Sequence, residues 1–426
     1  MTLCAIQSND QDRLFDSTHV HPGRALSLLL DRILTVGNLA FVDGSSGELL
    51  HFGDRSGPEV ILGLTAVAAR RISANPDLAL GEAFVDGTLV LVKGTLADMF
   101  ALLFRNKAAL KLSQSNLSNI ALRLKRRFQQ TNARLRSRRN VEHHYDLSLD
   151  LYRLFLDADM QYSCAYFAEP GMTLEEAQLA KKRHLISKLL LEPGQRVLDI
   201  GCGWGGMALE VAATEQVSVL GVTLSGEQLQ VARERASLSN AHFELTDYRD
   251  VEGSFHRIVS VGMFEHVGVP NYDTFFQKIA GLLTDDGVAV IHSIGRKDGP
   301  DITNPWIEKY IFPGGYIPAL SEVLPAIERA GLWVTDIEIL RLHYAETLVE
   351  WQRRFHAHRS QIAKLYDERF CRMWDFYLAS SESAFRHQGH MNFQIQLARR
   401  VDAVPLTRDY ITDNDRANAR PMADAA

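Results

Sequence analysis

A glycine-rich loop carries the clearest chemical signal in this sequence of 426 residues. The loop consists of Val197, Leu198, Asp199, Ile200, Gly201, Cys202, Gly203, Trp204 and Gly205. Glycines let a ligand approach the backbone closely, and the amino terminus of the helix that follows favours a polar or negative group. The acidic Asp199 suits a cationic amino-acid moiety and would repel a pyrophosphate. We therefore expect a ligand other than a dinucleotide.

Two later segments offer polar groups to the same ligand. The next apolar run ends without the acidic residue that binds ribose in dinucleotide enzymes, and Thr223 and Gln228 are the polar candidates there. Farther on, Asp247 could accept from an exocyclic amine and Tyr248 could stack on a ring, although a surface turn explains both equally well. The form D-x-G-x-G-x-G resembles the first motif of S-adenosylmethionine-dependent methyltransferases.

The elements that position this loop alternate between strand and helix. Short β-branched runs read RVLDIG, VSVLGVT, RIVSVG and GVAVIHSIG, and segments of helical spacing lie between them. This alternation predicts an α/β fold with a doubly wound, Rossmann-like parallel sheet. We expect the final hundred residues to be mostly helical, with Phe370, Met373, Trp374 and Tyr377 forming an aromatic stripe that packs in a core.

The pattern divides the chain into four parts. Residues 1–104 are expected to form a small α+β domain, with a helix at 24–34, three strands between residues 37 and 64, and a helix that opens at Thr95. A basic linker follows over 105–142. The alternating domain covers 143–410, and 411–426 form a tail.

Composition excludes several classes of protein. With 46% hydrophobic and 23% charged residues, the chain can bury a sizeable core and is neither disordered nor fibrous. No stretch approaches the ~18 apolar residues of a membrane span, and the first residues lack the pattern of a secretory signal. The four cysteines form no CxxC pair, so we predict no metal site and a reducing cytoplasm.

The basic linker contrasts with the net charge of −6. Eleven Lys or Arg and no acidic residue lie between Arg105 and Arg139. A solvated linker helix explains the run, and so does attraction to nucleic acid or to anionic lipid. The linker alone does not decide between them.

Ten motifs make the sequence recognisable. They read, in chain order, HYDLSLDLYRLFLD, QYSCAYF, TLEEAQLAK, VLDIGCGWGG, GVTLSGEQ, DYRD, RIVSVGMFEHVG, NYDTFFQKI, HSIG and WIEKYIFPGG. Together they closely resemble the cyclopropane-fatty-acyl-phospholipid synthases and the related mycolic-acid cyclopropane and methyl transferases. The resemblance covers about residues 140–400, and residues 1–104 resemble more loosely the extra domain of the phospholipid-acting members.

The resemblance implies which residues bind S-adenosylmethionine. The matching positions are Tyr162, Ser163, the loop from Val197 to Gly205, Thr223, Leu224, Ser225, Gly226, Glu227, Gln228, Tyr248 and Arg249, beside the candidate Asp247. The family also holds a bicarbonate ion beside the reacting methyl group. The positions that match its ligands are Cys164, Glu265, His292 and Tyr344, and each keeps the expected side chain.

The chemistry explains why such an anion is needed. Methyl transfer to a cis double bond leaves a carbocation on the acyl chain, and ring closure then removes a proton from the methyl just added. A base must lie within hydrogen-bond reach of that methyl. Aromatic faces can stabilise the cation, and Tyr166, Phe167, Tyr316 and Tyr344 are candidates. We expect Cys164 to be a positional contact and not a nucleophile.

The resemblance also bears on partners. An enzyme that acts on acyl chains of phospholipids must visit an anionic bilayer, so the basic linker is expected to dock on the inner face of the membrane, and no nucleic acid is expected. A homodimer is what the family implies. Ser381 stands where many members have a cysteine that has been proposed as catalytic, and we expect that cysteine to be dispensable.

The expected activity is therefore transfer of a methylene equivalent from S-adenosylmethionine to an unsaturated phospholipid chain. Three alternatives stay open: a related C-methyltransferase that makes a methyl-branched or methyl-alkene chain, a small-amine N-methyltransferase, and a lipid-binding protein with a silent methyltransferase domain. The first shares all ten motifs. The N-terminal domain and the basic linker argue against the second, and the complete cofactor loop argues against the third.

Overall fold

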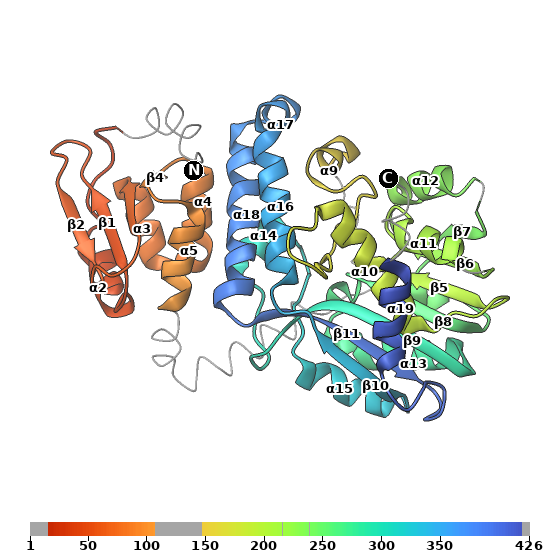
Figure 1. Cartoon of the computed structure of the whole chain (residues 1–426). Coiled ribbons are helices and arrows are strands. Elements are labelled where there is room, and N and C mark those ends of the chain that lie inside the picture. Colours follow the sequence, from red (N-terminus) through yellow and green to blue (C-terminus); the bar gives the residue numbers. More distant parts are fainter. Residues whose placement is uncertain (1–15, 107–146, 215, 238, 420–426) are drawn as a thin grey trace. The chain divides into compact units, whose positions relative to one another are not determined.

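The computed structural model describes residues 16–106, 147–214, 216–237 and 239–419 (Figure 1). These residues form two compact units. The first unit contains the described residues before 107 together with Thr303–Ile311 and Trp351–Gln388, and the second contains the rest. This division differs from the domain ranges expected from the sequence, because two later segments join the N-terminal residues. The predicted helix in the basic linker lies outside the described residues.

The N-terminal part of the first unit is a four-stranded sheet with helices. The sheet has the order β2-β1-β3-β4, with β1 and β3 parallel. The strands are β1 (Asn38–Val42), β2 (Leu49–Phe52), β3 (Glu59–Leu64) and β4 (Leu89–Lys93), and the helices are α2 (Arg24–Ile33), α3 (Ala66–Ala74), α4 (Pro76–Val85) and α5 (Leu96–Arg105). Helix α5 opens at Thr95 as predicted, through a capping box in which Thr95 Oγ1 accepts from the Asp98 N–H at 3.1 Å and Asp98 accepts from the Thr95 N–H at 3.0 Å.

Helices from the C-terminal half complete this unit. They are α14 (Pro305–Tyr310), α17 (Arg359–Leu365) and α18 (Glu368–His387). The Phe376 ring of α18 lies 5.0 Å from the Phe100 ring of α5, and the Arg372 guanidinium donates to the carbonyl of Val85 at 2.8 Å. In the predicted aromatic stripe, Trp374 and Tyr377 are buried, so part of the stripe is core as expected.

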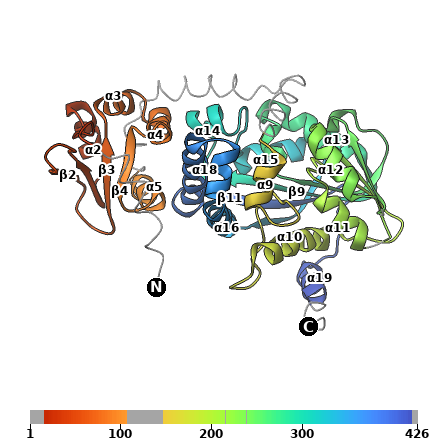
Figure 2. The same cartoon turned by 90° about the horizontal axis from the view of Figure 1, so that it is seen from above.

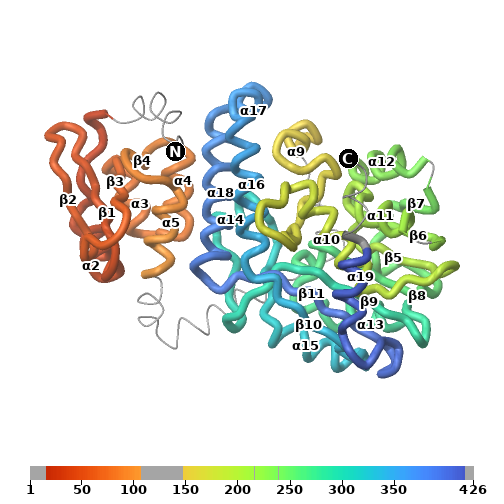
Figure 3. Tube along the Cα trace, viewed as in Figure 1, coloured from red at the N-terminus to blue at the C-terminus, as the bar shows by residue number. Residues whose placement is uncertain are grey.

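The second unit is built on a seven-stranded sheet of order β10-β11-β9-β8-β5-β6-β7 (Figure 3). Its strands are β5 (Arg196–Ile200), β6 (Ser218–Thr223), β7 (Ala241–Leu245), β8 (Phe255–Val261), β9 (Leu283–Arg296), β10 (Trp333–Ile339) and β11 (His390–Ala398). The five strands from β5 to β9 are parallel, and β11 runs antiparallel between β9 and β10. Parallel strands direct their carboxyl ends to one edge, where ligands bind in open α/β sheets.

Helices cover both faces of this sheet. Helices α10 (Leu174–Leu189), α11 (Gly206–Thr214) and α12 (Gly226–Arg235) pack on one face, and α13 (Tyr272–Leu282) and α15 (Leu320–Arg329) pack on the other. Figure 2 shows α10 and α11 on the side opposite α13. The remaining helices are α9 (Leu149–Phe155), α19 (Asp409–Ala419) and α16 (His343–Ala357), whose residues from Trp351 on belong to the first unit. The predicted α/β class with a doubly wound sheet is confirmed.

The C-terminal region is mostly helical, as expected, but it also contributes strands β10 and β11 to the sheet. Strand β11 lies in the interior of the sheet and is paired with β9 from His390 to Ala398. Its apolar residues Met391, Phe393 and Ile395 enter one core, and the alternating polar residues are buried on the opposite face. No helix within the described ranges is both long and apolar enough to cross a bilayer.

Candidate active site

The predicted glycine-rich loop joins β5 to α11 at the carboxyl edge of the sheet. Gly201 has φ +81° and Gly205 has φ +87°, in the left-handed region that favours glycine. A Cβ on Gly205 would lie 2.9 Å from the Phe243 ring and 3.1 Å from the Ala232 Cβ, so this position also needs glycine for packing. The loop therefore holds its shape through backbone geometry that other residues would strain.

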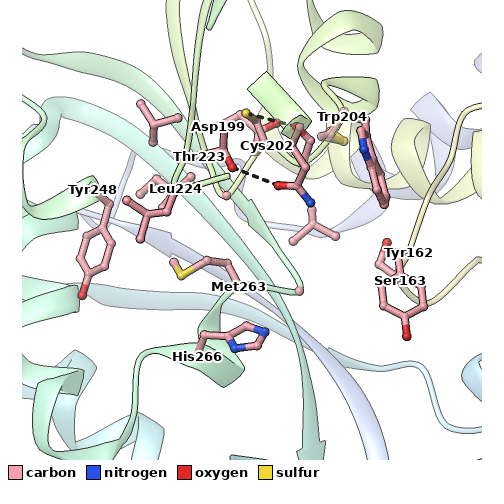
Figure 4. Close-up of a pocket in the computed structure, with 18 of the residues that line it drawn as sticks. Tyr162, Ser163, Asp199, Cys202, Trp204, Thr223, Leu224, Tyr248, Met263 and His266 are labelled. Atoms are coloured by element: carbon pink, nitrogen blue, oxygen red, sulfur yellow. Dashed lines mark hydrogen bonds between the residues drawn. The ribbon is translucent and has the colours of Figure 1, made fainter. Parts of the chain in front are cut away.

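A cavity opens beside this loop (Figure 4). Fourteen of the predicted cofactor residues line it: Tyr162, Ser163, Asp199, Ile200, Gly201, Cys202, Gly203, Trp204, Thr223, Leu224, Gln228, Asp247, Tyr248 and Arg249. They come from the segment after α9, the β5 loop, the end of β6 and the turn after β7. The structure thus brings together segments that are separated by up to about ninety residues of sequence.

Six predicted cofactor residues do not line the cavity, and their role stays a prediction. Val197 and Leu198 point into the two cores of the sheet. Ser225 accepts from the Gln228 N–H and caps α12. Gly205 packs against Phe243, and Gly226 and Glu227 are exposed on the first turn of α12.

Sequence reasoning missed other residues of the lining. They include Met160, Gln161, Met207, Val222, Thr246, Val261, Gly262, Met263, His266, Val267 and Gly314. The last residues of β8 and the loop after it contribute five of them. The rule that ligands lie at the carboxyl ends of neighbouring parallel strands would have pointed to this loop, since β8 is the neighbour of β5.

Asp199 sets the charge of the cavity. The residue is 1% exposed, and neither carboxylate oxygen has a hydrogen-bond partner among the described residues. Burial raises the pKa of Asp199 to about 7, although the Lys181 ammonium and the Ala208 N–H oppose the shift. A buried carboxylate without a partner favours a cation, because a ligand ammonium would replace the lost hydration. The cavity therefore fits the cationic amino-acid end of S-adenosylmethionine.

Two further contacts shape the cavity. The Thr223 hydroxyl donates to Gln228 Oε1 at 3.0 Å, which fixes both predicted polar groups (Figure 4). Asp247 is held by the Arg249 guanidinium, whose Nε lies 2.8 Å from Oδ1. The Tyr248 ring packs edge-on against Phe275 at 5.3 Å. These contacts keep the side chains in place without a ligand.

The four residues predicted to hold an anion are all buried, and none of them lines this cavity. The Ala165 N–H, next to Cys164, donates to Thr347 Oγ1 at 3.0 Å, which joins the Cys164 segment to the helix of Tyr344. Glu265 Oε1 accepts from the Ile294 N–H at 2.6 Å, two residues from His292. The first contact therefore brings the Cys164 segment next to the helix of Tyr344, and the second brings Glu265 next to the strand of His292.

Glu265 resembles Asp199 in its environment. Its Oε2 is buried and has no hydrogen-bond partner within the described ranges. Burial raises the pKa of Glu265 to about 7, against the effect of the Ile294 N–H and the Ser293 hydroxyl. Its neighbours Met263 and His266 line the cofactor cavity, so this carboxyl lies in the loop that borders the cavity.

Burial also bears on Cys164 and Tyr166. The pKa of the Cys164 thiol is raised by burial, so the thiol is neutral and a poor nucleophile. The Tyr166 ring stacks on His184 at 4.3 Å and on His343 at 4.9 Å. Because two rings occupy its faces, Tyr166 is not free to stabilise a carbocation, contrary to expectation.

Lys181 was not predicted as part of the site. It is fully buried, and its ammonium donates to Gln161 Oε1 at 2.6 Å and to Ser163 Oγ at 2.9 Å. Burial lowers the pKa of Lys181 to about 8. Its charge acts on the ionisation of Asp199 in the cavity and of Cys164 and His292 among the predicted anion ligands.

Comparison with known proteins agrees with this geometry. The family model described as mycolic acid cyclopropane synthetase matches residues 132–395. The cyclopropane-fatty-acyl-phospholipid synthase of Escherichia coli K12 is 44% identical over 259 residues, which are 61% of this chain and 67% of that protein. The tuberculostearic acid methyltransferase UfaA1 of Mycobacterium tuberculosis is 40% identical over 272 residues, 60% of this chain and 63% of that protein.

Solved structures show the same relationship. The cyclopropane synthase MmaA2 from Mycobacterium tuberculosis is 34% identical, with a TM-score of 0.58 over 61% of this chain and 98% of that chain. The mycolic acid cyclopropane synthase CmaA1, complexed with SAH and CTAB, gives the same identity and TM-score over 61% of this chain and 97% of that chain. The chain therefore belongs to the mycolic acid cyclopropane synthetase family and is an S-adenosylmethionine-dependent methyltransferase.

Proposed function

We propose that this enzyme transfers a methylene equivalent from S-adenosylmethionine to the cis double bond of an unsaturated phospholipid acyl chain. The products are a cyclopropane acyl chain and S-adenosylhomocysteine. The observation that carries the proposal is the buried Glu265 carboxyl, with one oxygen unpartnered among the described residues, in the loop that borders the cofactor cavity. Methyl transfer to an amine leaves the new methyl intact, whereas ring closure must remove a proton from it and so needs a base held beside that methyl.

The residues have separate tasks in this reaction. Asp199 attracts the ammonium of the methyl donor, and the glycines of the loop let its backbone approach the nucleoside. Gly262, Met263 and Val267 give the border of the cavity an apolar or small lining, which excludes water from the sulfonium. Glu265, with a pKa near 7, both accepts from the Ile294 N–H and keeps Oε2 for a hydrogen-bond donor.

The donor set fits a small oxyanion. Glu265 offers an oxygen that can accept from the hydroxyl of a bicarbonate, and His292 and Tyr344 offer donors. A bound bicarbonate would supply a base that does not attack the methyl sulfonium. In this proposal Cys164 contributes position, because its neutral thiol is buried.

The substrate and the membrane belong to the same proposal. The E. coli relative is named for phospholipid, and the eleven basic residues between Arg105 and Arg139 suit an anionic bilayer. At about 1 kcal/mol for each Lys or Arg near such a surface, a few contacts suffice for reversible docking. We propose peripheral association with the inner face of the membrane and a homodimer, which vesicle flotation and analytical ultracentrifugation test.

An alternative product is suggested by the 40% identical relative, which is named a tuberculostearic acid methyltransferase. Loss of a different proton from the same carbocation gives a methyl-alkene. Reduction by a partner that donates hydride gives a methyl-branched chain. Glu265 favours ring closure, since it places an acid–base group beside the cavity.

The test uses purified protein, S-adenosylmethionine and vesicles of a cis-monounsaturated phospholipid that contain anionic lipid. Mass spectrometry with ozonolysis should show one added CH₂ and loss of the ozone-reactive double bond. An added CH₂ with the double bond retained would replace ring closure by the methyl-alkene alternative. No product from a protein that binds S-adenosylhomocysteine would refute the lipid substrate and favour a small amine.

A further inference from the structure

A buried chain of polar side chains ends on His292. It crosses β11, β10 and α10 and involves Gln394, Lys188, Glu338 and His184. Lys188 and Gln394 are completely inaccessible to solvent, and His292 is 1% exposed. None of these partners lines the cofactor cavity, and the proposed reaction gives them no task.

The direction of the hydrogen bonds can be read from Lys188. Its ammonium is a pure donor, and it lies 2.7 Å from the side-chain oxygen of Gln394 and against the Glu338 carboxylate. The Glu338 carboxylate also contacts His184 Nε2 at 2.7 Å, which keeps Glu338 ionised and in place. Gln394 must therefore direct Oε1 to Lys188.

The orientation of Gln394 determines the proton on His292. With Oε1 on Lys188, the amide nitrogen Nε2 faces His292 Nδ1 at 3.1 Å and donates to it. A nitrogen that accepts a hydrogen bond carries no proton, so Nδ1 is the bare nitrogen and Nε2 carries the hydrogen. On its other side, His292 Nε2 lies 3.4 Å from the amide nitrogen Nδ2 of Asn392. With the proton on Nε2 both atoms are donors, so this contact at the long limit is not a hydrogen bond.

The surroundings also keep His292 neutral. Burial, Lys181, Lys188 and His184 all lower the pKa of His292, and only Glu338 opposes them. A neutral imidazole whose Nδ1 is already engaged has one function left, which is donation from Nε2.

We propose that Gln394, oriented by Lys188, is a positioning residue that fixes His292 as the neutral tautomer with its proton on Nε2. His292 is then a hydrogen-bond donor to the anion and not the base that takes the proton. The tautomer follows from the hydrogen bonds alone, whereas donation to the anion rests on the proposed function.

The first test is ¹⁵N nuclear magnetic resonance of histidine-labelled full-length protein. The His292→Gln variant identifies the signals of His292. We expect one protonated and one bare ring nitrogen, with the proton on Nε2, throughout pH 6 to 8. A proton on Nδ1, or a doubly protonated ring in this range, would overturn the proposal whatever the substrate proves to be.

Variants then test whether Gln394 sets the tautomer. Gln394→Glu puts an acceptor opposite Nδ1 and should move the proton to Nδ1. Gln396→Glu is the matched control, because Gln396 lies two residues along the same face of β11 and contacts the Lys188 carbonyl instead of His292. Lys188→Met, which releases Oε1, gives a second test if Gln394→Glu does not fold.

Activity provides a separate readout. We expect Gln394→Glu to lower kcat for vesicle phospholipid about 10- to 100-fold, the loss typical when the residue that orients a metal-ligating histidine is replaced. KM and the affinity for S-adenosylhomocysteine should stay within twofold. An unchanged His292 tautomer in Gln394→Glu refutes the positioning role, whereas wild-type protein inactive on phospholipid refutes the proposed function and leaves the tautomer result intact.

Discussion

Replacing Asp199 by Asn should stabilise the free enzyme and weaken its cofactor binding. The reason is that Asp199 is 1% exposed and its two oxygens have no hydrogen-bond partner within the described ranges. Its pKa is about 7 in the folded chain, compared with an ordinary value of 3.8. The folded state therefore binds the proton more tightly than the unfolded state.

The sign and size of the stability effect follow from this difference. As pH rises from about 4 to about 7, the unfolded chain has already released the proton and the folded chain still holds it, so stability falls over this window. About three pH units at about 1.4 kcal/mol each give a penalty of about 4 kcal/mol at pH 8. Leaving amide donors unpaired costs the Asn variant about 1–3 kcal/mol, so the net gain at pH 8 is about 1–3 kcal/mol.

Cofactor affinity should change in the opposite direction. Loss of a buried charge opposite a ligand ammonium costs on the order of 2–3 kcal/mol, or about 30- to 150-fold in the Kd of S-adenosylhomocysteine. In the wild type, affinity should fall below pH 7, because ligand binding requires the ionised carboxylate.

The assays are urea denaturation at pH 5 and pH 8 and calorimetric titration with S-adenosylhomocysteine. The control is Asp285→Asn, at a carboxyl whose side chain is 83% exposed. Asp199→Asn should exceed the wild type in stability at pH 8 and not at pH 5. A variant that is less stable at pH 8 and binds the ligand within threefold of the wild type would refute the account of this charge.

Three further predictions concern other parts of the chain. Glu265→Gln should lower kcat on phospholipid by about 10²–10⁴ with unchanged S-adenosylhomocysteine affinity. Wild-type turnover should rise with pH through about 7, because Glu265 ionises there. Equal turnover of the variant and the wild type would contradict this role. Ser381→Cys should keep turnover within twofold, since no step needs a thiol there, and a larger gain would restore that cysteine to the mechanism. Replacing Arg123 and residues 125–127 by Gln should weaken flotation with anionic vesicles on the order of a hundredfold at low salt, without effect on neutral vesicles.

Local signals in the sequence were sufficient for much of the fold. The β-branched run before Asp199, the glycines after it and the Thr95 cap each determine their own conformation, and all three elements form where predicted. The alternation of strand and helix also predicted that residues at the carboxyl ends of the strands line the cavity. Proximity in sequence to the lining residues was a weaker guide. Val197 and Glu227 belong to the predicted segments, but Val197 lies in the core and Glu227 is exposed.

Features that depend on distant contacts were not predictable in this way. Strand β11 alternates Phe393 and Ile395 with Gln394 and Gln396, the pattern of a strand with one solvated face. Its polar face is instead buried against α10, where Lys188 satisfies the amides. Only the three-dimensional structure shows that this buried partner exists, because the two segments are about two hundred residues apart.

The most direct test of the central claim is lipid mass spectrometry on cells that express this chain and lack their own synthase. Feeding methionine with a trideuterated methyl group distinguishes the products, because ring closure must remove one deuterium. We predict phospholipid acyl chains that gain a CD₂ unit and lose their ozone-reactive double bond. Chains that keep the double bond, or lipids that remain unlabelled while the protein binds S-adenosylhomocysteine, would contradict the account.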